Sequence, residues 1–286
     1  MKNIELNETQ LASVKRIGLD ILNDIDRICR ENGINYSLAY GTLLGGIRHH
    51  GFIPWDDDID LMMLREDYDK FIKIAPIELN EKFYLLTHDL YNGYGLFFAK
   101  VMAKKTLMKE ITNAKVDAPA GVFVDVFPLD NFPDDLEEQK KIYKRIKILK
   151  RVSAFKLNYD HGQKGLHRAV FRIRKVLYTF FSLQIVRDKY SAILEKYKDA
   201  SFVKEVCNFS GVYGIQKDTY YKEWFEEYEN IKFENLTVKV ISRYYDRMEN
   251  TMINHNDTSS GGGVFRKLNK VIAISNIFSC VFEEVA

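Results

Sequence analysis

The run Pro54-Trp55-Asp56-Asp57-Asp58-Ile59-Asp60 constrains this chain more than any other feature of its sequence. It places four carboxylates within five residues, and the polar and apolar alternation that follows predicts a strand over 58–64. Because residues two apart on a strand share a face, we expect Asp58 and Asp60 side by side, with Asp56 on the same parity. Neighbouring carboxylates repel each other unless a cation lies between them or water reaches both. The run is therefore either a divalent-cation site or a solvated acidic turn.

A glycine-rich segment precedes the acidic run. Gly41-Thr42-Leu43-Leu44-Gly45-Gly46 follows a predicted strand over 34–40 and leads into a short predicted helix, capped by Thr42, that extends to Arg48. Glycine lets a ligand approach the backbone, and the first N–H groups of a helix attract phosphate. It is not a Walker A loop, since no Gly-Lys-Ser or Gly-Lys-Thr is present. Gly41 and Thr42 are candidate phosphate-binding residues, and Arg48 can clamp a diphosphate or bond the aspartates.

Two further candidate residues lie on strands predicted over 96–103 and 122–127. Asp125 stands mid-strand among apolar neighbours, so its carboxylate needs a metal, a cation or a helix end as its partner. Lys100 either points inward and balances phosphate charge, or is a surface lysine.

Composition excludes several classes of protein. The chain has 286 residues, of which 46% are hydrophobic, enough for a substantial core. Its cysteines, Cys29, Cys207 and Cys280, are far apart, which indicates neither a disulfide framework nor a zinc site and fits a reducing cytoplasm. We expect no signal peptide, because the first ten residues are polar, and no membrane span, because no run of 18 apolar residues exists.

Helices over 134–156 and 166–198 predict a mainly helical second half. Between Gln139 and Lys175 there are 13 Lys or Arg residues and one acidic residue. Such a basic amphipathic segment either lies on anionic lipid or covers a core with its apolar face. No nucleic-acid-binding motif accompanies it, so no nucleic-acid partner is expected.

The acidic run and the glycine segment belong to one recognisable block. Tyr40 to Asp60, read as YGTLLGGIRHHGFIPWDDDID, resembles the hallmark block of the LicD family, which is related to fukutin and fukutin-related protein. The segments 65–68, REDY, and 121–130, GVFVDVFPLD, resemble further family motifs. The similarity extends from about residue 34 to about residue 236. Two departures are Tyr40, where the family often has a small residue, and a C-terminal end without the usual Tyr-Gly-Asp-Tyr-like stretch.

The resemblance implies an α/β nucleotidyltransferase core of the polymerase-beta type with a mixed sheet, spanning 1–133. It further implies a mainly helical half of the same domain over 134–258, and a Gly/Ser break with a divergent tail follows over 259–286. Mg²⁺, as one or two ions for which Mn²⁺ can substitute, would be held by Asp58, Asp60 and Asp125. The catalytic set would include these and Asp56, with Asp56 or Asp125 as the proton acceptor. Donor-binding residues would be Gly41, Thr42, Arg48 and Lys100.

The implied reaction transfers a phospho-alcohol, most often phosphocholine, from a CDP-alcohol donor to a hydroxyl of a cell-surface glycan and releases CMP. Teichoic acid, lipopolysaccharide and capsule are the acceptors expected, lipid-linked during assembly, with the enzyme at the inner face of the membrane. Two alternatives stay open. One is a nucleotidyltransferase that moves NMP from an NTP to a small molecule such as an aminoglycoside. The other is a glycan-binding protein without activity.

Overall fold

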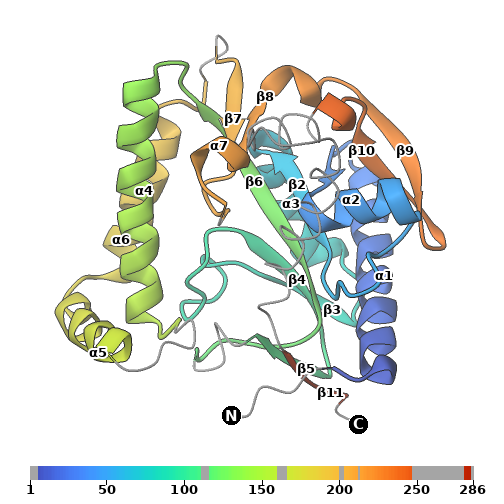
Figure 1. The fold of residues 1–286 in the computed structure, drawn as a ribbon, viewed down its shortest axis with the longest axis horizontal. Coiled ribbons are helices and arrows are strands. Elements are labelled where there is room, and N and C mark those ends of the chain that lie inside the picture. The colour runs from blue at the N-terminus through green and yellow to red at the C-terminus, as the bar shows by residue number, and fades with distance from the viewer. Residues whose placement is uncertain are drawn as a thin grey trace, which may run out of the picture.

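The computed structural model describes residues 6–110, 116–159, 166–199, 203–211, 213–246 and 280–284. A curved mixed sheet occupies the centre, with α1 on one side of the molecule and a group of later helices on the other (Figure 1). The expected α/β core with a mixed sheet is therefore confirmed.

The central sheet has its strands in the order β1-β2-β6-β4-β3. These strands are β1 (Ser37–Leu38), β2 (Asp60–Leu64), β6 (Phe123–Phe132), β4 (Ala99–Ala103) and β3 (Phe83–Leu86). Only β2 and β6 pair in parallel; the other neighbours are antiparallel. The end of β6 pairs with β7 (Glu205–Cys207), which pairs with β8 (Thr219–Tyr221). The long β6 thus touches three strands and organises the sheet.

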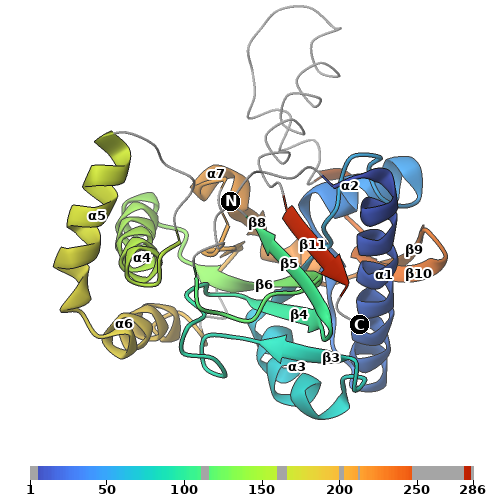
Figure 2. The ribbon, with the colours of Figure 1, turned by 90° about the horizontal axis from the view of Figure 1, so that it is seen from below.

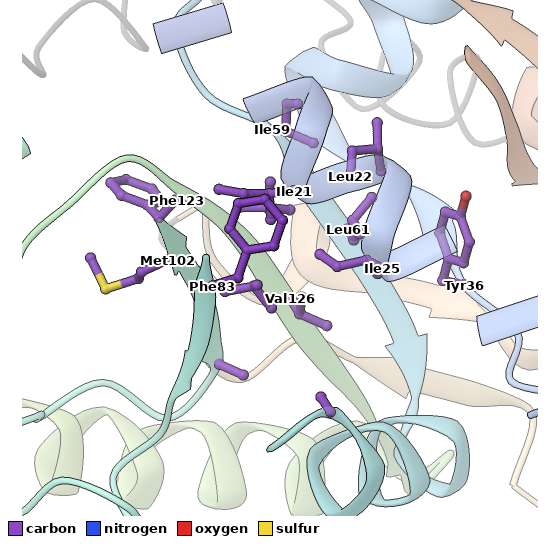
Figure 3. Close-up of a cluster of buried hydrophobic side chains, with 14 of the residues drawn as sticks. Ile21, Leu22, Ile25, Tyr36, Ile59, Leu61, Phe83, Met102, Phe123 and Val126 are labelled. Atoms are coloured by element: carbon purple, nitrogen blue, oxygen red, sulfur yellow. The ribbon is translucent and has the colours of Figure 1, made fainter. Parts of the chain in front are cut away.

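Helix α1 (Glu8–Glu31) supplies much of the core. Asn7 and Gln10 form the capping box that their spacing predicts. The helix then presents Ile21, Leu22 and Ile25 to the sheet, where they pack among residues of β2, β4 and β6 (Figure 3). On the sheet side, alternate strand residues such as Leu61 and Val126 enter the same cluster. Helix α3 (Arg65–Glu78) follows β2 directly and contacts β2, β3 and β6.

The glycine segment is more helical than predicted. Helix α2 (Tyr40–His49) begins at Tyr40, whose φ of 45° turns the chain sharply out of the short β1. Thr42 is therefore inside the first turn and is not the cap, which is Ala39. Gly45 is required by close packing, since a Cβ there would lie 2.5 Å from the carbonyl oxygen of Gly51.

The expectation of a mainly helical second half is wrong. Helices α4 (Leu136–Lys156), α5 (Leu166–Thr179) and α6 (Leu183–Glu195) are present, but strands follow them. After β7, α7 (Ile215–Asp218), β8 and the 3-10 helix η1 (Lys222–Phe225), the hairpin of β9 (Tyr228–Phe233) and β10 (Leu236–Ile241) returns to the first core. Val238 and Val240, two residues apart, are fully buried there. Burial along this segment therefore repeats every two residues, as in a strand, and not every 3.6 residues, as in a helix.

A smaller strand pair lies outside the main sheet. β5 (Thr106–Glu110) pairs with β11 (Cys280–Glu284), close to the C-terminal end of the chain (Figure 2). The predicted Gly/Ser break over 259–263 lies outside the described residues. Among the residues that the structure describes, no helix is both long and apolar enough to cross a membrane.

Packing of α1 on the sheet should dominate stability. Ile25 is fully buried, so we expect Ile25→Ala to lower the free energy of unfolding by about 2–5 kcal/mol through lost burial and a residual cavity. Ile77, 84% exposed on α3, is the matched control, and Ile77→Ala should change stability by less than about 0.5 kcal/mol. Urea unfolding measures both, and equal losses for the two variants would contradict this packing.

Candidate active site

Three charged residues lie directly opposite one another across β2, β6 and β4. The register pairs Asp60 with Asp125 and Asp125 with Lys100. Directly opposed residues share a face of the sheet, so the three side chains form a row. Lys100 is buried, and its Nζ lies 2.8 Å from Oδ1 of Asp125. The buried ammonium therefore has a carboxylate partner in the row, and Lys100 is not a surface lysine.

The first turn of α2 lies beside this row. The hydroxyl oxygen of Thr42 accepts a hydrogen bond from the backbone N–H of Asp60 at 2.9 Å. A Cβ on Gly41 would lie 2.8 Å from Oδ2 of Asp56, so glycine allows the acidic run to approach the helix. The structure thus brings the N–H groups of this helix turn next to the carboxylates. A helix N-terminus attracts anions, which suits a phosphate held between backbone and metal.

The acidic run differs from its prediction in one respect. Strand β2 begins at Asp60 and not at Asp58, so Asp56, Asp57 and Asp58 lie in the loop before it. Oxygen atoms of these three carboxylates lie within 4.8 Å of one another. The strand is shorter than predicted because its first backbone hydrogen bond to β6 comes only at Ile59, whose carbonyl accepts from the N–H of Asp125 at 2.9 Å.

Electrostatics in the loop disfavour ionisation. Burial, followed by the nearby charge of Asp58 and a hydrogen bond to it, raises the pKa of Asp56 to about 8 from a usual 3.8. Burial also raises the pKa of Asp60 well above its usual value, reinforced by Asp58, Asp125 and Asp56 and opposed by Lys100. A divalent cation would remove this repulsion. The ligands offered are all carboxylate oxygens, which fits Mg²⁺ or Mn²⁺ and not a soft metal.

Two distant residues hold the acidic loop in place. Lys15 of α1 donates to the carbonyl oxygens of Ile53 at 3.3 Å and Pro54 at 3.0 Å. Burial lowers the pKa of Lys15, while the charges of Asp56 and Glu234 oppose that shift. Glu234, in the turn between β9 and β10, accepts from the N–H of Phe52 at 3.0 Å. Neither positioning role is visible in the sequence, because each contact joins segments at least 38 residues apart.

Aromatic rings line the neighbourhood of the carboxylates. The ring of Tyr40 lies 5.7 Å from that of Phe127 and 5.4 Å from that of Tyr213, and Phe98 lies 4.5 Å from Phe127. Tyr213 is 38% exposed. Burial raises its pKa to about 12, and the charges of Asp60 and Asp58 add to the shift, so the hydroxyl lies within the field of the acidic residues. Sequence analysis missed this group because its members come from four separate segments.

The Tyr40 side chain is fixed from the second half of the chain. Its hydroxyl donates to Oδ1 of Asp218 at 3.1 Å and accepts from Nδ2 of Asn208 at 2.7 Å. Asp218 is fully buried and also accepts from the N–H groups of Tyr213 and Gly214. Tyr40, one of the two departures from the family pattern, is thus part of a polar network beside the site.

Arg48 is farther from the row than the other predicted residues. It lies exposed in the last turn of α2, seven residues after Gly41, which corresponds to about 10 Å of helix. The structure therefore brings together Gly41, Thr42, Asp56, Asp58, Asp60, Lys100 and Asp125, while Arg48 projects from the opposite end of the helix.

A cavity of about 290 Å³ lies at the other end of the sheet, where β2 and β6 finish. Leu64, Arg65 and Asp130 are among the residues that line it. The Arg65 guanidinium donates to both oxygens of Asp130, at 2.6 and 2.9 Å. Four strand residues, or about 13 Å, separate Leu64 from Asp60, so this cavity is separate from the row of charged residues.

Comparison with known proteins agrees with this geometry. Residues 33–151 match the family described as LicD/FKTN/FKRP, nucleotidyltransferase domain. The chain is 31% identical over 255 residues to the lipopolysaccharide cholinephosphotransferase LicD of Haemophilus influenzae, covering 87% of this chain and 90% of that protein.

Two uncharacterised rickettsial proteins match over shorter stretches. One, from Rickettsia typhi, is 32% identical over 27% of this chain and 25% of its own length. The other, from Rickettsia prowazekii, is 24% identical over 49% of both chains. The similarity to the Haemophilus protein extends well beyond the nucleotidyltransferase segment into the helices and the β9–β10 hairpin. On this evidence the chain belongs to the LicD family and is a phosphotransferase of that type.

Proposed function

We propose that this enzyme transfers phosphocholine from CDP-choline to a hydroxyl of a cell-surface glycan, of the lipopolysaccharide kind or a related lipid-linked polymer, and releases CMP. One observation carries the proposal: Asp60, Asp125 and Lys100 stand in one row beside the first turn of α2. A diphosphate is bound by a metal cation, which the carboxylates can hold, by a positively charged side chain, and by the N–H groups at the start of a helix. The Haemophilus relative, named as a cholinephosphotransferase, supports the choice of donor and acceptor class.

Asp58, Asp60 and Asp125 would hold Mg²⁺, with Asp56 and Asp57 adding negative charge nearby. When bound there, Mg²⁺ supplies charge neutralisation on the diphosphate and, as a pair of ions, a lower pKa for the attacking hydroxyl. The site suits such an ion because its carboxylates are crowded and repel one another.

The side chains and backbone of the chain do the positioning. The N–H groups of Gly41 and Thr42 bind phosphate oxygens, and Lys100 balances their charge from β4. The acceptor oxygen attacks the phosphorus that carries choline, a new P–O bond forms, and the P–O bond to the phosphate of CMP breaks. Asp56 takes the hydroxyl proton, since Asp125 is already engaged with Lys100. Arg48, at the far end of α2, would contact a part of the donor beyond the diphosphate.

The aromatic group favours choline over an uncharged alcohol. A quaternary ammonium is attracted to the face of an aromatic ring, and Tyr213 presents a partly exposed ring near the carboxylates. Tyr40, Phe127 and Phe98 continue that aromatic wall. Ribitol or glycerol would gain little from these rings.

The first prediction tests the reaction and the metal set together. With Mg²⁺, the protein should release CMP from CDP-choline, and Asp58→Asn or Asp60→Asn should lower the rate at least about 100-fold without loss of fold. CDP-ribitol, CDP-glycerol, CDP-ethanolamine and the NTPs form the comparison set, assayed for CMP and pyrophosphate and checked by circular dichroism. Pyrophosphate release from an NTP would instead establish a nucleotidyltransferase, and near-normal activity in either variant would remove the aspartate from the site.

The second prediction concerns Tyr213. Replacing it by Leu removes the ring but keeps an apolar side chain, so the KM for CDP-choline should rise about 2- to 30-fold, the range of a cation–π contact. Tyr213→Phe should behave like the wild type. CDP-glycerol, which has no cation, is the internal control. If Tyr213→Leu affects both donors equally, the ring does not recognise choline.

The third prediction concerns pH. The folded-state pKa of Asp56, about 8, lies above its usual 3.8, so its protonated form stabilises the fold; that contribution is complete below 3.8 and is lost as the pH rises through about 8. Thermal unfolding in EDTA should therefore show that the free energy of unfolding of the wild type falls relative to that of Asp56→Asn as the pH rises from 5 toward 9. The expected loss is about 1.4 kcal/mol for each pH unit between the unfolded and folded pKa values of Asp56 that this range covers. Mg²⁺ should stabilise wild type more at pH 9 than at pH 6. If the stability of the two proteins changes with pH in the same way, crowding of the carboxylates does not raise the pKa of Asp56.

A further inference from the structure

The connection between α5 and α6 exposes an unusual number of large apolar side chains. Six of them lie within 13 residues and are between 50% and 87% exposed: Ile173, Val176, Leu177, Phe180, Phe181 and Ile185. Isolated exposed apolar residues are ordinary, but so many within one short connection mark a surface that another body covers.

Three of the six residues form one face of α5. Ile173, Val176 and Leu177 are spaced i, i+3 and i+4, and Phe180 follows in the turn. The opposite face holds the helix to α4: the ring of Tyr178 stacks 5.7 Å from that of Phe155. We call Ile173, Val176, Leu177 and Phe180 the apolar stripe. Because these side chains are exposed, the stripe does not cover the protein core, which excludes the alternative that this amphipathic segment packs on a core with its apolar face.

The contacts with α4 fix the orientation of the stripe. The guanidinium of Arg174 lies 5.7 Å above the ring of Phe155, and Nζ of Lys156 donates to the carbonyl of Phe181 at 2.6 Å. These bonds hold α5 at the edge of the molecule, away from the central sheet, where both views show it (Figures 1 and 2). A flat surface can reach it there without meeting the catalytic half.

Charge identifies what covers the stripe. Between residues 166 and 186 there are four Lys or Arg and neither Asp nor Glu. At about 100° per residue, Arg172 and Arg174 flank Ile173 on its two sides, the arrangement of a helix that lies in a lipid interface. A second copy of the chain would instead bring two segments of the same charge together.

We propose that the α5–α6 connection, residues 172–185, docks on an anionic lipid bilayer. The apolar side chains enter the boundary between headgroups and acyl chains, and Arg172 beside them meets the lipid phosphates. This places the enzyme on the surface where lipid-linked polymers are assembled. The docking itself does not depend on the proposed reaction.

Vesicle flotation with the full chain tests the proposal. We expect binding to phosphatidylcholine vesicles that contain phosphatidylglycerol, weak binding to phosphatidylcholine alone, and loss of binding at high salt. Ile173→Ser/Val176→Ser/Phe180→Ser should reduce binding at least about tenfold, because the changed side chains are those that enter the lipid. Arg172→Gln, which removes one flanking charge, should reduce it roughly fivefold.

Matched controls are available on α3 and the loop after β3. Ile77→Ser/Leu90→Ser removes two equally exposed apolar side chains, and Lys70→Gln/Lys73→Gln removes two exposed charges; neither should change binding. Equal binding to neutral and anionic vesicles, or an unaffected triple variant, overturns the proposal. So does a dimer in light scattering that the triple variant dissociates, since a second copy would then occupy the stripe.

Discussion

The parallel pairing of β2 with β6 sets the carboxylate of Asp60 against that of Asp125, an arrangement whose repulsion is only partly offset by Lys100 on β4. Burial adds to the difficulty by raising the pKa of Asp60. The rest of the site follows from this constraint. A parallel register that holds two carboxylates together leaves them in need of a cation, and the first turn of α2 provides the N–H groups that a phosphate between cation and backbone would bind.

The remainder of the fold keeps these groups from moving apart. Ile59, buried beside α1, ties the acidic loop to the core (Figure 3). Lys15 and Glu234 bond the backbone just before the acidic run, Lys15 to carbonyl oxygens and Glu234 to an N–H. The β9–β10 hairpin thus has a positioning role although it lies more than 160 residues after the loop. The second half therefore helps to position the candidate site, and the Tyr40–Asp218 bond joins the two halves again beside the aromatic rings.

Local patterns in the sequence predicted the elements near the site and failed where long-range contacts decide. The acidic run, the glycine segment and the strands that carry Lys100 and Asp125 could be predicted directly, since each depends on neighbours in the chain. Strand β2 begins two residues later than predicted because the first backbone bond to β6 comes only at Ile59, after the acidic loop. Helix α2 begins earlier than predicted, at Tyr40, which adopts a positive φ. The β9–β10 hairpin was missed because its alternation is short. The aromatic group has no local signal at all.

A crystal grown with Mn²⁺ and CDP-choline would test the account most directly, because Mn²⁺ is located by its anomalous signal. The account predicts an anomalous peak within about 2.2 Å of carboxylate oxygens of Asp58 and Asp60, with a diphosphate oxygen within about 3.2 Å of an N–H in the Gly41–Thr42 turn. A peak bound only elsewhere, such as in the cavity beside Arg65, or a diphosphate out of reach of that turn, would contradict it.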